Sequence, residues 1–367
     1  MGVISFARGM PGPDLLPIGE LGDCARLALE RDGATILNYG PPGGYAPLRE
    51  WIAARHGIDP ARVIVTNGSL QGFNFVARHF VQGDTKVFVE APCYDRSLQI
   101  LRRLGAEVEA IPLCEEGLDV EALAESLART DGKALVYTIP TFQNPSGRTL
   151  SLESRRRLLE IARARGNVTI LEDDPYGLLR FEGDPLPRLV ELAEGDGVLF
   201  LSSFSKTVAP GIRVGYLLLP EALVPAIEGF VLENYVSPSV FVQGALHEFV
   251  RAGRFDPNVE RIRAALCQRR DTMIAGLARE LPEGSSWNEP EGGYFLWLDL
   301  PAGVRGDALL AEAAAVDVTF VKGADFYLGG GGEEAVRLAF SYATPEEIGE
   351  GLARFGRLVR EAAAVAA

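Results

Sequence analysis

Short apolar runs alternate with amphipathic stretches between about residues 60 and 220. The apolar runs are bounded by Gly, Pro, Asp and Asn, as buried strands are, and leucines recur at helical spacing in the stretches between them. Strands that alternate with helices predict a largely parallel sheet with both faces covered. The predicted strands are Val63–Thr66, Lys86–Glu90, Glu107–Pro112, Ala134–Thr138, Val168–Glu172, Val198–Ser202 and Val214–Leu219, and the clearest helices between them are Phe73–Phe80, Leu118–Leu127 and Leu152–Arg165.

The pattern changes after residue 220. A long helical tract from about Glu260 to Arg279 is followed by three short strands near Tyr294–Asp299, Val318–Lys322 and Ala335–Ser341, mixed with helices. This part of the chain predicts a smaller α+β domain, to which the N-terminal residues also contribute. We therefore expect an α/β protein with a mostly parallel, seven-stranded sheet in a large domain over residues 40–260. Residues 1–39 and 261–367 are expected to form the small domain.

One polar segment follows the strand Val198–Ser202. It contains Ser203, Ser205 and Lys206, and Arg213 lies seven positions after the lysine. A lysine among hydroxyls at a strand end is well placed to form an imine with an aldehyde, and the hydroxyls and the guanidinium suit a phosphate. A phosphorylated aldehyde held by a lysine describes pyridoxal 5′-phosphate (PLP). A surface lysine explains this segment equally well when it is considered alone.

Three consecutive acids, Glu172, Asp173 and Asp174, end the strand Val168–Glu172. Carboxylates directly after a buried strand are costly unless a charge partner or solvent receives them. PLP needs an acid beside its pyridine nitrogen, because a protonated ring withdraws electrons from the substrate. Adjacent strand residues point to opposite faces, so only one acid can face the cofactor; Asp173 is favoured and Asp174 is the alternative. A solvated turn closed by Pro175 is the simpler explanation.

Two further turns follow predicted strands. Asn144 begins an Asn-Pro-Ser-Gly turn after Ala134–Thr138 and lies 29 residues before Asp173 (173 − 144), where its amide can reach the hydroxyl of a PLP ring. Gly68, Ser69 and Leu70 lie between a strand and a helix. Such a turn offers free backbone N–H groups and the positive end of the helix dipole to an anion. An ordinary strand-to-helix turn has the same pattern.

In their order and spacing, these motifs resemble the fold-type I PLP-dependent aminotransferases of class I/II, and are similar to the 2-aminoadipate and kynurenine aminotransferase group. The resemblance continues outside the chemistry-bearing turns and covers nearly the whole chain. The segments that carry it are Asn38–Arg49, Thr66–Gly72, Glu90–Tyr94, Asn144–Gly147, Asp173–Tyr176, Ser203–Arg213 and Val336–Ser341.

The resemblance implies PLP as cofactor, Lys206 as the catalytic residue and no metal. It makes the turn at Gly68 the main phosphate cradle, in which Leu70 replaces the usual glutamine. Tyr94 is expected to stack on the ring, and Tyr176 to hydrogen-bond the ring hydroxyl. The remaining cofactor-binding residues that it implies are Ser69, Asn144, Asp173, Ser203, Ser205, Lys206 and Arg213, together with Tyr39 from the neighbouring subunit of a homodimer with shared active sites.

For the substrate, the resemblance assigns Arg337 to the α-carboxylate, assisted by Asn144, because a guanidinium grips a carboxylate with two parallel bonds. Arg8 and Gly9 belong to a loop that covers the substrate side chain. Arg8 stands where a small residue is usual, and it either faces a side-chain carboxylate or turns outward to solvent. Where the family commonly has Pro-Gly, this chain has Lys322 and Gly323, so the approach of that loop to the substrate stays open.

The implied reaction moves the amino group of an L-amino acid to a 2-oxo acid, with 2-oxoglutarate as the favoured acceptor. The expected donors are glutamate, 2-aminoadipate, and apolar or aromatic amino acids. Other PLP chemistry on the same scaffold, such as β-elimination or another lyase reaction, is the alternative. This fold also occurs behind a DNA-binding helix-turn-helix, but only a few dozen residues precede Tyr39.

Composition narrows the class of protein. The formal net charge of −14 and the pI near 4.9 argue against a nucleic-acid partner. The histidines and cysteines are scattered, which argues against a metal cluster or a disulfide framework. No apolar run approaches the length of a membrane span, and the N-terminus lacks a signal pattern. The expectation is a soluble, cytoplasmic protein that acts on small molecules.

Overall fold

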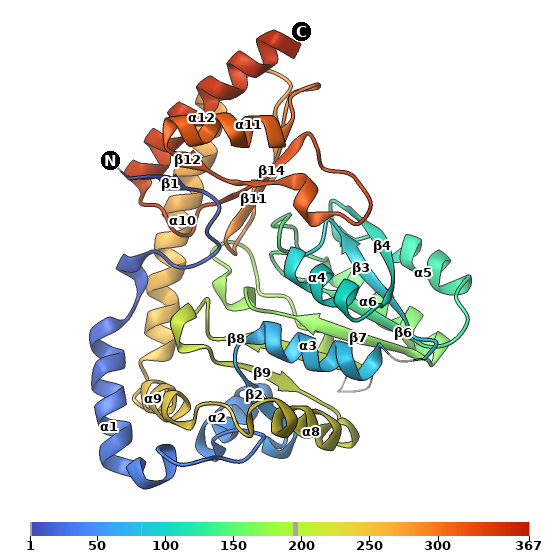
Figure 1. The fold of residues 1–367 in the computed structure, drawn as a ribbon, viewed down its shortest axis with the longest axis vertical. Helices are drawn as coiled ribbons and strands as arrows, with labels where there is room; N and C mark the ends of the chain where they lie inside the picture. Colours follow the sequence, from blue (N-terminus) through green and yellow to red (C-terminus); the bar gives the residue numbers. More distant parts are fainter. Residues whose placement is uncertain (1, 82, 194–196, 367) are drawn as a thin grey trace.

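The computed structural model describes residues 2–81, 83–193 and 197–366 (Figure 1). Within these residues, the largest sheet has eight strands in the order β2-β9-β8-β7-β6-β3-β4-β5. Its strands are β2 Val63–Thr66, β3 Lys86–Ala91, β4 Glu107–Cys114, β5 Gly117–Leu118, β6 Ala134–Thr138, β7 Val168–Asp173, β8 Val198–Ser203 and β9 Gly215–Leu218.

The sheet is mostly parallel, as the alternating pattern predicts. Strands β8, β7, β6, β3 and β4 run parallel to one another, whereas β9 is antiparallel to both β2 and β8. The seven predicted strands are all present, with ends that differ by at most two residues. The additional strand β5 was predicted as the start of a helix. That helix, α5 (Val120–Ala128), begins only after Asp119, whose side chain caps it by accepting a hydrogen bond from the backbone N–H of Ala122 at 2.9 Å.

Alternate residues of the central strands pack on opposite faces of this sheet. Val87 of β3 lies in one core together with residues of α3 (Ser69–Phe80) and α4 (Asp95–Arg103). Its neighbour Phe88 lies in another core, with α5 and α6 (Leu152–Arg165). A two-residue side-chain period with both faces apolar is what a sheet between helical layers requires. The remaining helices of this part of the chain are α2 Ala46–His56, α7 Leu189–Leu192, α8 Val224–Tyr235, α9 Val240–Arg251 and α1 Ile18–Ile36, of which α1 packs against α9.

A second sheet is built from the C-terminal part of the chain (Figure 1). Its order is β10-β11-β14-β13, formed by Ser286–Trp287, Phe295–Asp299, Ala335–Ala339 and Val321–Lys322. The predicted strand Val318–Lys322 is divided, because Val318–Thr319 (β12) pairs instead with β1 (Ile4–Ser5) at the N-terminus. The helices of this region are α10 Phe255–Glu280, α11 Gly306–Ala313 and α12 Pro345–Ala366.

Of the N-terminal residues, β1 pairs with β12 of the C-terminal part of the chain, whereas α1 packs against α9. The domain boundary expected at residue 260 falls within α10, a continuous helix that also packs against α12. The boundaries themselves stay a prediction. None of the helices in the described part of the chain has the length and the apolar character that crossing a bilayer requires.

Candidate active site

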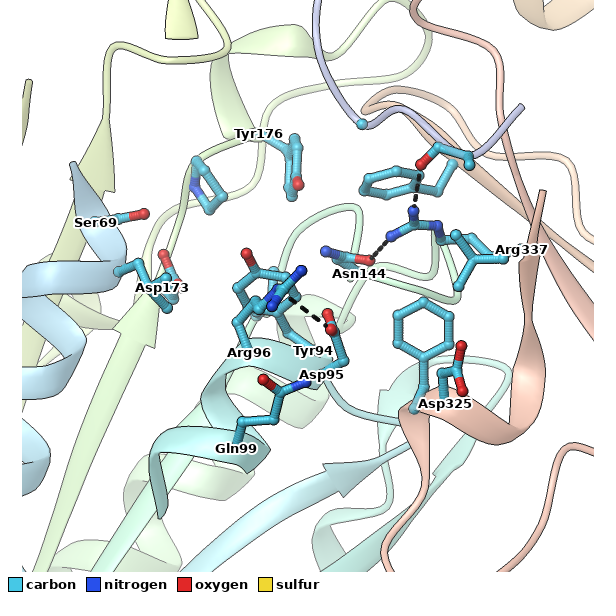
Figure 2. A pocket seen from close by; sticks show the side chains of 18 of the residues that line it. Ser69, Tyr94, Asp95, Arg96, Gln99, Asn144, Asp173, Tyr176, Asp325 and Arg337 are labelled. Atoms are coloured by element: carbon cyan, nitrogen blue, oxygen red, sulfur yellow. Dashed lines mark hydrogen bonds and ion pairs between the residues drawn. The ribbon is translucent and has the colours of Figure 1, made fainter. Parts of the chain in front are cut away.

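The chemistry-bearing turns meet in one cavity of about 990 Å³. This is a volume typical of sites that bind a cofactor together with a small substrate. It is lined by the turns that follow β2, β3, β6, β7 and β8, and is closed by β11, β14 and the N-terminal segment (Figure 2). The predicted site residues that line it are Gly9, Ser69, Leu70, Tyr94, Asn144, Asp173, Tyr176, Ser203, Ser205, Lys206, Arg213 and Arg337.

Lys206 reaches the cavity from a tight turn after β8. Ser203 Oγ accepts the backbone N–H of Ser205 at 3.1 Å and donates to Ser205 Oγ at 2.8 Å, which fixes the turn. The Lys206 ammonium donates to the carbonyl of Gly9. Burial lowers the pKa of Lys206 to about 8, with further lowering by the cations Arg337 and Arg213 and an opposing effect of Asp173. An amine with such a pKa is partly neutral near neutral pH, as a nucleophile or a base must be.

The three acids at the end of β7 are all buried and point in different directions. Glu172 accepts the backbone N–H groups of α7, and Asp174 pairs with Arg188 Nε at 3.0 Å. Asp173 faces the cavity, where its Oδ2 accepts the hydroxyl of Tyr137 at 2.9 Å. The simpler explanation of a solvated turn is therefore wrong. The preference for Asp173 as the acid that faces the cavity agrees with the structure.

Asp173 has an unmet hydrogen-bonding requirement. Its Oδ1 is buried and has no partner among the described residues. Burial, the largest cause, raises the pKa of Asp173 to about 7, and Asp174 and Glu90 raise it further, while the Tyr137 hydroxyl lowers it. Orphaned buried carboxylate oxygens are rare unless a ligand supplies the donor. A protonated pyridine nitrogen is such a donor, so the residues fit PLP.

The turn before α3 offers a fitting place for the phosphate. Gly68 has a φ of +82°, and a Cβ on it would collide with Arg213 Nη2. The absence of a side chain therefore lets this guanidinium lie against the start of α3, where Arg213 Nη2 donates to the carbonyl of Asn67 at 3.1 Å. Ser69 is the first residue of the helix, whose free N–H groups attract an anion. Gly68 shapes this corner without lining the cavity.

Arg337 is a buried cation without a carboxylate partner among the described residues. Its Nη1 donates to Asn144 Oδ1 and its Nη2 to the carbonyl of Ala7, both at 2.8 Å, while Nε has no partner (Figure 2). The guanidinium lies 4.2 Å from the centre of the Phe295 ring. Burial lowers its pKa to about 10. A buried, unpaired guanidinium is a binding site for an anionic ligand, since only an anion offsets its loss of hydration.

Two tyrosines point into the cavity from different elements (Figure 2). Tyr94 immediately precedes α4, and burial raises the pKa of its hydroxyl to about 12. Tyr176 follows β7, and burial raises the pKa of its hydroxyl well above its usual value. Both hydroxyls therefore stay protonated at neutral pH and can donate a hydrogen bond.

Arg8, for which the sequence leaves an inward and an outward orientation open, points away from the cavity. Its side chain is exposed and does not line the cavity. Arg8 Nη1 donates to the Tyr342 hydroxyl at 2.9 Å, and the guanidinium stacks 4.8 Å from the centre of the same ring. This contact with Tyr342 leaves the Arg8 guanidinium exposed to solvent and outside the cavity, which is the outward orientation.

Tyr39 also lies away from the cavity of its own chain, and its side chain is 84% exposed. That position is compatible with a role in a neighbouring subunit, which stays a prediction. Lys322 forms an ion pair with Asp325 at 3.4 Å instead of entering the cavity.

Sequence reasoning missed one face of α4. Asp95, Arg96, Gln99 and Arg102 line the cavity on the C-terminal side of Tyr94, and Asp95 pairs with Arg96 at 3.5 Å (Figure 2). Positions 95, 99 and 102 have the i, i+4, i+7 spacing of one helix face, so their pattern was visible in the sequence. Ala7, Phe295, Asp325 and Tyr327 were missed because each comes from a distant segment.

Comparisons with known proteins agree with this geometry. The model of the family described as "Aminotransferase class I and II" matches residues 19–355. A 2-aminoadipate transaminase of Thermus thermophilus is 38% identical, with 98% of this chain and 90% of that protein covered. An aromatic-amino-acid aminotransferase of Thermococcus litoralis is 35% identical, with 98% and 88% covered.

Solved structures give the same picture. An alpha-aminoadipate aminotransferase of Thermus thermophilus, in complex with N-(5′-phosphopyridoxyl)-L-leucine, superposes with a TM-score of 0.95. It is 35% identical, and 99% of this chain and 94% of that chain are covered. A kynurenine aminotransferase of Pyrococcus horikoshii superposes with a TM-score of 0.92 at 33% identity, with 98% and 91% covered.

Proposed function

The chain belongs to the class I and II aminotransferases, and from that premise we propose that it moves the amino group of glutamate, 2-aminoadipate, or an apolar or aromatic amino acid to a 2-oxo acid, with 2-oxoglutarate as the favoured acceptor. The general activity, PLP-dependent amino-group transfer with the fold-type I architecture, follows from the family and its relatives. The substrate range and the role of each residue are the proposed part.

One observation carries the proposal. The cavity holds an unpaired cation, Arg337, and an amine of lowered pKa, Lys206, which are the groups that bind and deprotonate an α-amino acid. Asp173 Oδ1, buried and without a partner among the described residues, lines the same cavity. PLP, when bound, supplies an electron-withdrawing ring that stabilises negative charge at the substrate α-carbon.

Each residue then has a task. With PLP bound, Lys206 would be the residue that attaches it, and a neutral Nζ at this position could accept the proton from the substrate α-carbon. Asp173 Oδ1 would accept the hydrogen bond of a protonated pyridine nitrogen, and Tyr137 donates to the other carboxylate oxygen. Arg337 and Asn144 hold the α-carboxylate, so that the Cα–H bond is presented to the lysine. Tyr94 would cover the PLP ring and Tyr176 would hydrogen-bond its hydroxyl, while Ser69, Ser203, Ser205 and Arg213 would hold the phosphate.

The donor range rests on two supports. The relatives are named for 2-aminoadipate and for aromatic amino acids. The cavity wall combines aromatic rings, among them Phe295 and Phe326, with the exposed cation Arg96. Because Arg8 does not line the cavity, Arg96 is the cation that we expect to bind an acidic substrate side chain. Both apolar and acidic side chains therefore find compatible surroundings.

A homodimer with shared sites in the cytoplasm completes the proposal. Tyr39 and its neighbour Leu37 are 84% and 71% exposed, and exposed large apolar side chains at adjoining positions favour a covered surface. Cys24, Cys93, Cys114 and Cys267 are free thiols, in keeping with a reducing compartment.

Mixing Tyr39→Phe with Lys206→Ala subunits should produce heterodimers with one intact composite site. Full activity of a demonstrated monomer would contradict the shared site.

The substrate proposal is tested with a panel of L-amino acids and 2-oxoglutarate. We expect glutamate or 2-aminoadipate, and also leucine or phenylalanine, to convert the bound cofactor to its amine form and to release the matching 2-oxo acid. Elimination products in place of the 2-oxo acid, or no conversion with any of these donors, would overturn it.

A further inference from the structure

Glu90, at the C-terminal end of β3, is a buried carboxylate that no step of the reaction uses. Its side chain is 2% exposed, and no lysine or arginine pairs with it within the described ranges. Its Oε1 accepts Thr138 Oγ1 at 2.5 Å and the backbone N–H of Ile139 at 3.1 Å, and its Oε2 accepts Gln143 Nε2 at 2.9 Å. Burying a carboxylate without a cation is costly, so we expect Glu90 to have a role in the segment after β6, to which these hydrogen bonds hold it.

Gln143 connects this carboxylate to the loop that carries Asn144. The Oε1 of Gln143 accepts the backbone N–H of Ser146 at 2.8 Å, so the side chain spans the turn on either side of Asn144. The backbone N–H of Gln143 donates to the carbonyl of Arg148 at 2.8 Å, and the carbonyl of Gln143 accepts the backbone N–H of Gly147 at 2.6 Å. The bonds of Gln143, the residue before Asn144, to residues 146, 147 and 148 therefore fix the loop that carries Asn144.

The same amide also holds the loop that carries Tyr94. Gln143 Nε2 donates to the carbonyl of Pro92 at 2.8 Å, two residues before Tyr94. Strands β3 and β6 are parallel neighbours, so the two loops leave the sheet side by side. Glu90 and Gln143 therefore join the segment behind the cofactor-facing tyrosine to the segment behind the substrate-facing asparagine.

From these contacts we propose that Glu90 is a positioning residue for substrate binding: through Gln143 it fixes Asn144, and through Asn144 it sets the guanidinium of Arg337 against the substrate α-carboxylate. The last link is the 2.8 Å bond between Arg337 Nη1 and Asn144 Oδ1. The inference rests on the proposed role of Arg337 as the α-carboxylate receptor. Burial raises the pKa of Glu90 to about 7, against the lowering effect of the hydrogen bonds that Thr138, Gln143 and Ile139 donate to it.

The test uses Glu90→Gln with a matched control, Glu172→Gln. Glu172 is also fully buried at the end of a strand, but its oxygens accept the backbone N–H groups of Leu189 and Val190, away from the cavity. The probe is 3-phenylpropanoate, an unreactive carboxylate, with the PLP-loaded enzyme. In Glu90→Gln, we expect the Kd of 3-phenylpropanoate and the KM of the amino donor to rise roughly tenfold, which corresponds to one lost hydrogen bond. The kcat should change by less than about twofold.

We expect Glu172→Gln and Glu90→Gln to lower the thermal stability by similar amounts. In Glu172→Gln, however, Kd and KM should stay unchanged. If Glu90→Gln does not fold, Gln143→Leu keeps the carboxylate and removes the side chain that links it to the loop, together with that side chain's bonds to Pro92 and Ser146, and should raise Kd and KM. An unchanged Kd in Gln143→Leu, or equal effects of Glu90→Gln and Glu172→Gln on KM, would overturn the inference.

Arg337→Met separates this inference from the function on which it rests. If Arg337→Met weakens the binding of 3-phenylpropanoate and Glu90→Gln does not, the positioning role of Glu90 is wrong and the carboxylate site stands. If Arg337→Met also leaves the Kd unchanged, the carboxylate is bound elsewhere and the proposed substrate site falls together with the role of Glu90.

Discussion

Replacing Arg337 by methionine should affect activity and stability in different ways. The guanidinium is 7% exposed, has no ion-pair partner in the described part of the chain, and has a pKa lowered by burial from its ordinary 12.5 to about 10. That difference corresponds to about 3 kcal/mol of unfavourable charge burial in the free protein. Methionine fills a similar volume and removes this cost.

The relief of charge burial is partly offset in the folded protein. Arg337→Met leaves Asn144 Oδ1 and the carbonyl of Ala7 without their donor. Both line or adjoin the open cavity, where water can replace the guanidinium. We therefore expect the free energy of unfolding of the cofactor-free protein to stay within about 1 kcal/mol of the wild type or to rise by up to about 2 kcal/mol.

The loss of activity should be large. Truncating one partner of a buried charge pair costs roughly 2–5 kcal/mol, so kcat/KM for glutamate and for phenylalanine should fall roughly 30- to 5,000-fold alike. Both donors carry the same α-carboxylate, which is why the side chain should not matter. Urea denaturation and steady-state kinetics on the same preparation measure both effects.

Arg155→Met is the matched control. Arg155 is also fully buried, but its guanidinium donates to the carbonyls of Leu150, Pro140 and Pro187 and to the hydroxyl of Thr141, far from any ligand role. This variant should lose about 2–5 kcal/mol of stability because buried acceptors lose their donors. If Arg337→Met were destabilised as strongly as Arg155→Met and kept its kcat/KM, Arg337 would be a structural residue.

Asp173→Asn should keep the cofactor but lose roughly 10²- to 10⁴-fold in the single-turnover rate with an amino donor, whereas Asp174→Asn, which alters only the pair with Arg188, should be much milder. The reverse ranking would assign the ring nitrogen to Asp174. The folded-state pKa of Lys206, about 8, lies below the 10.5 expected for the unfolded chain, so the unfolded chain binds more protons between these values and the stability of the cofactor-free protein should rise with pH across this window. Lys206→Met should abolish this rise in denaturation curves, and an unchanged pH dependence would refute the lowered pKa. Gly68→Ala should weaken PLP binding by displacing Arg213, as measured by titration with the cofactor, while Gly57→Ala, at a left-handed glycine with open space around it, should not.

Patterns local in sequence predicted much of this molecule. The seven strands and the helix Leu152–Arg165 follow from apolar runs and leucine spacing, because each element is long enough to bury a face of its own. The two-residue strand β5 was missed, although Gly117 and Leu118 pair with β4 across a two-residue turn, because so short a strand has no alternating pattern of its own. Likewise, Val318–Lys322 was predicted as one strand but divides between two partners that lie far apart in the chain.

The site divides in the same way. The residues on turns directly after strands, such as Asn144, Asp173 and Lys206, were found because parallel strands bring their C-terminal ends together. The orientation of Arg8 was not predictable, because its partner Tyr342 lies 334 positions away. The bond between Glu90 and Gln143 was also not predicted, since a single buried glutamate among apolar residues has no sequence pattern that reveals its hydrogen-bond donors.

Chemical reduction of the PLP-loaded protein, followed by peptide mass spectrometry, locates the lysine that carries the cofactor. We predict that the phosphopyridoxyl group is found on Lys206, which alone among the chain's four lysines lines the cavity, and whose pKa is lowered by burial. Lys86 is paired with Glu107 and Glu109, Lys322 is paired with Asp325, and Lys133 is exposed. The modification should disappear in Lys206→Ala together with the yellow colour of the protein. A stoichiometric adduct on Lys86, Lys133 or Lys322, with Lys206 unmodified, would contradict the assignment of this cavity as the active site.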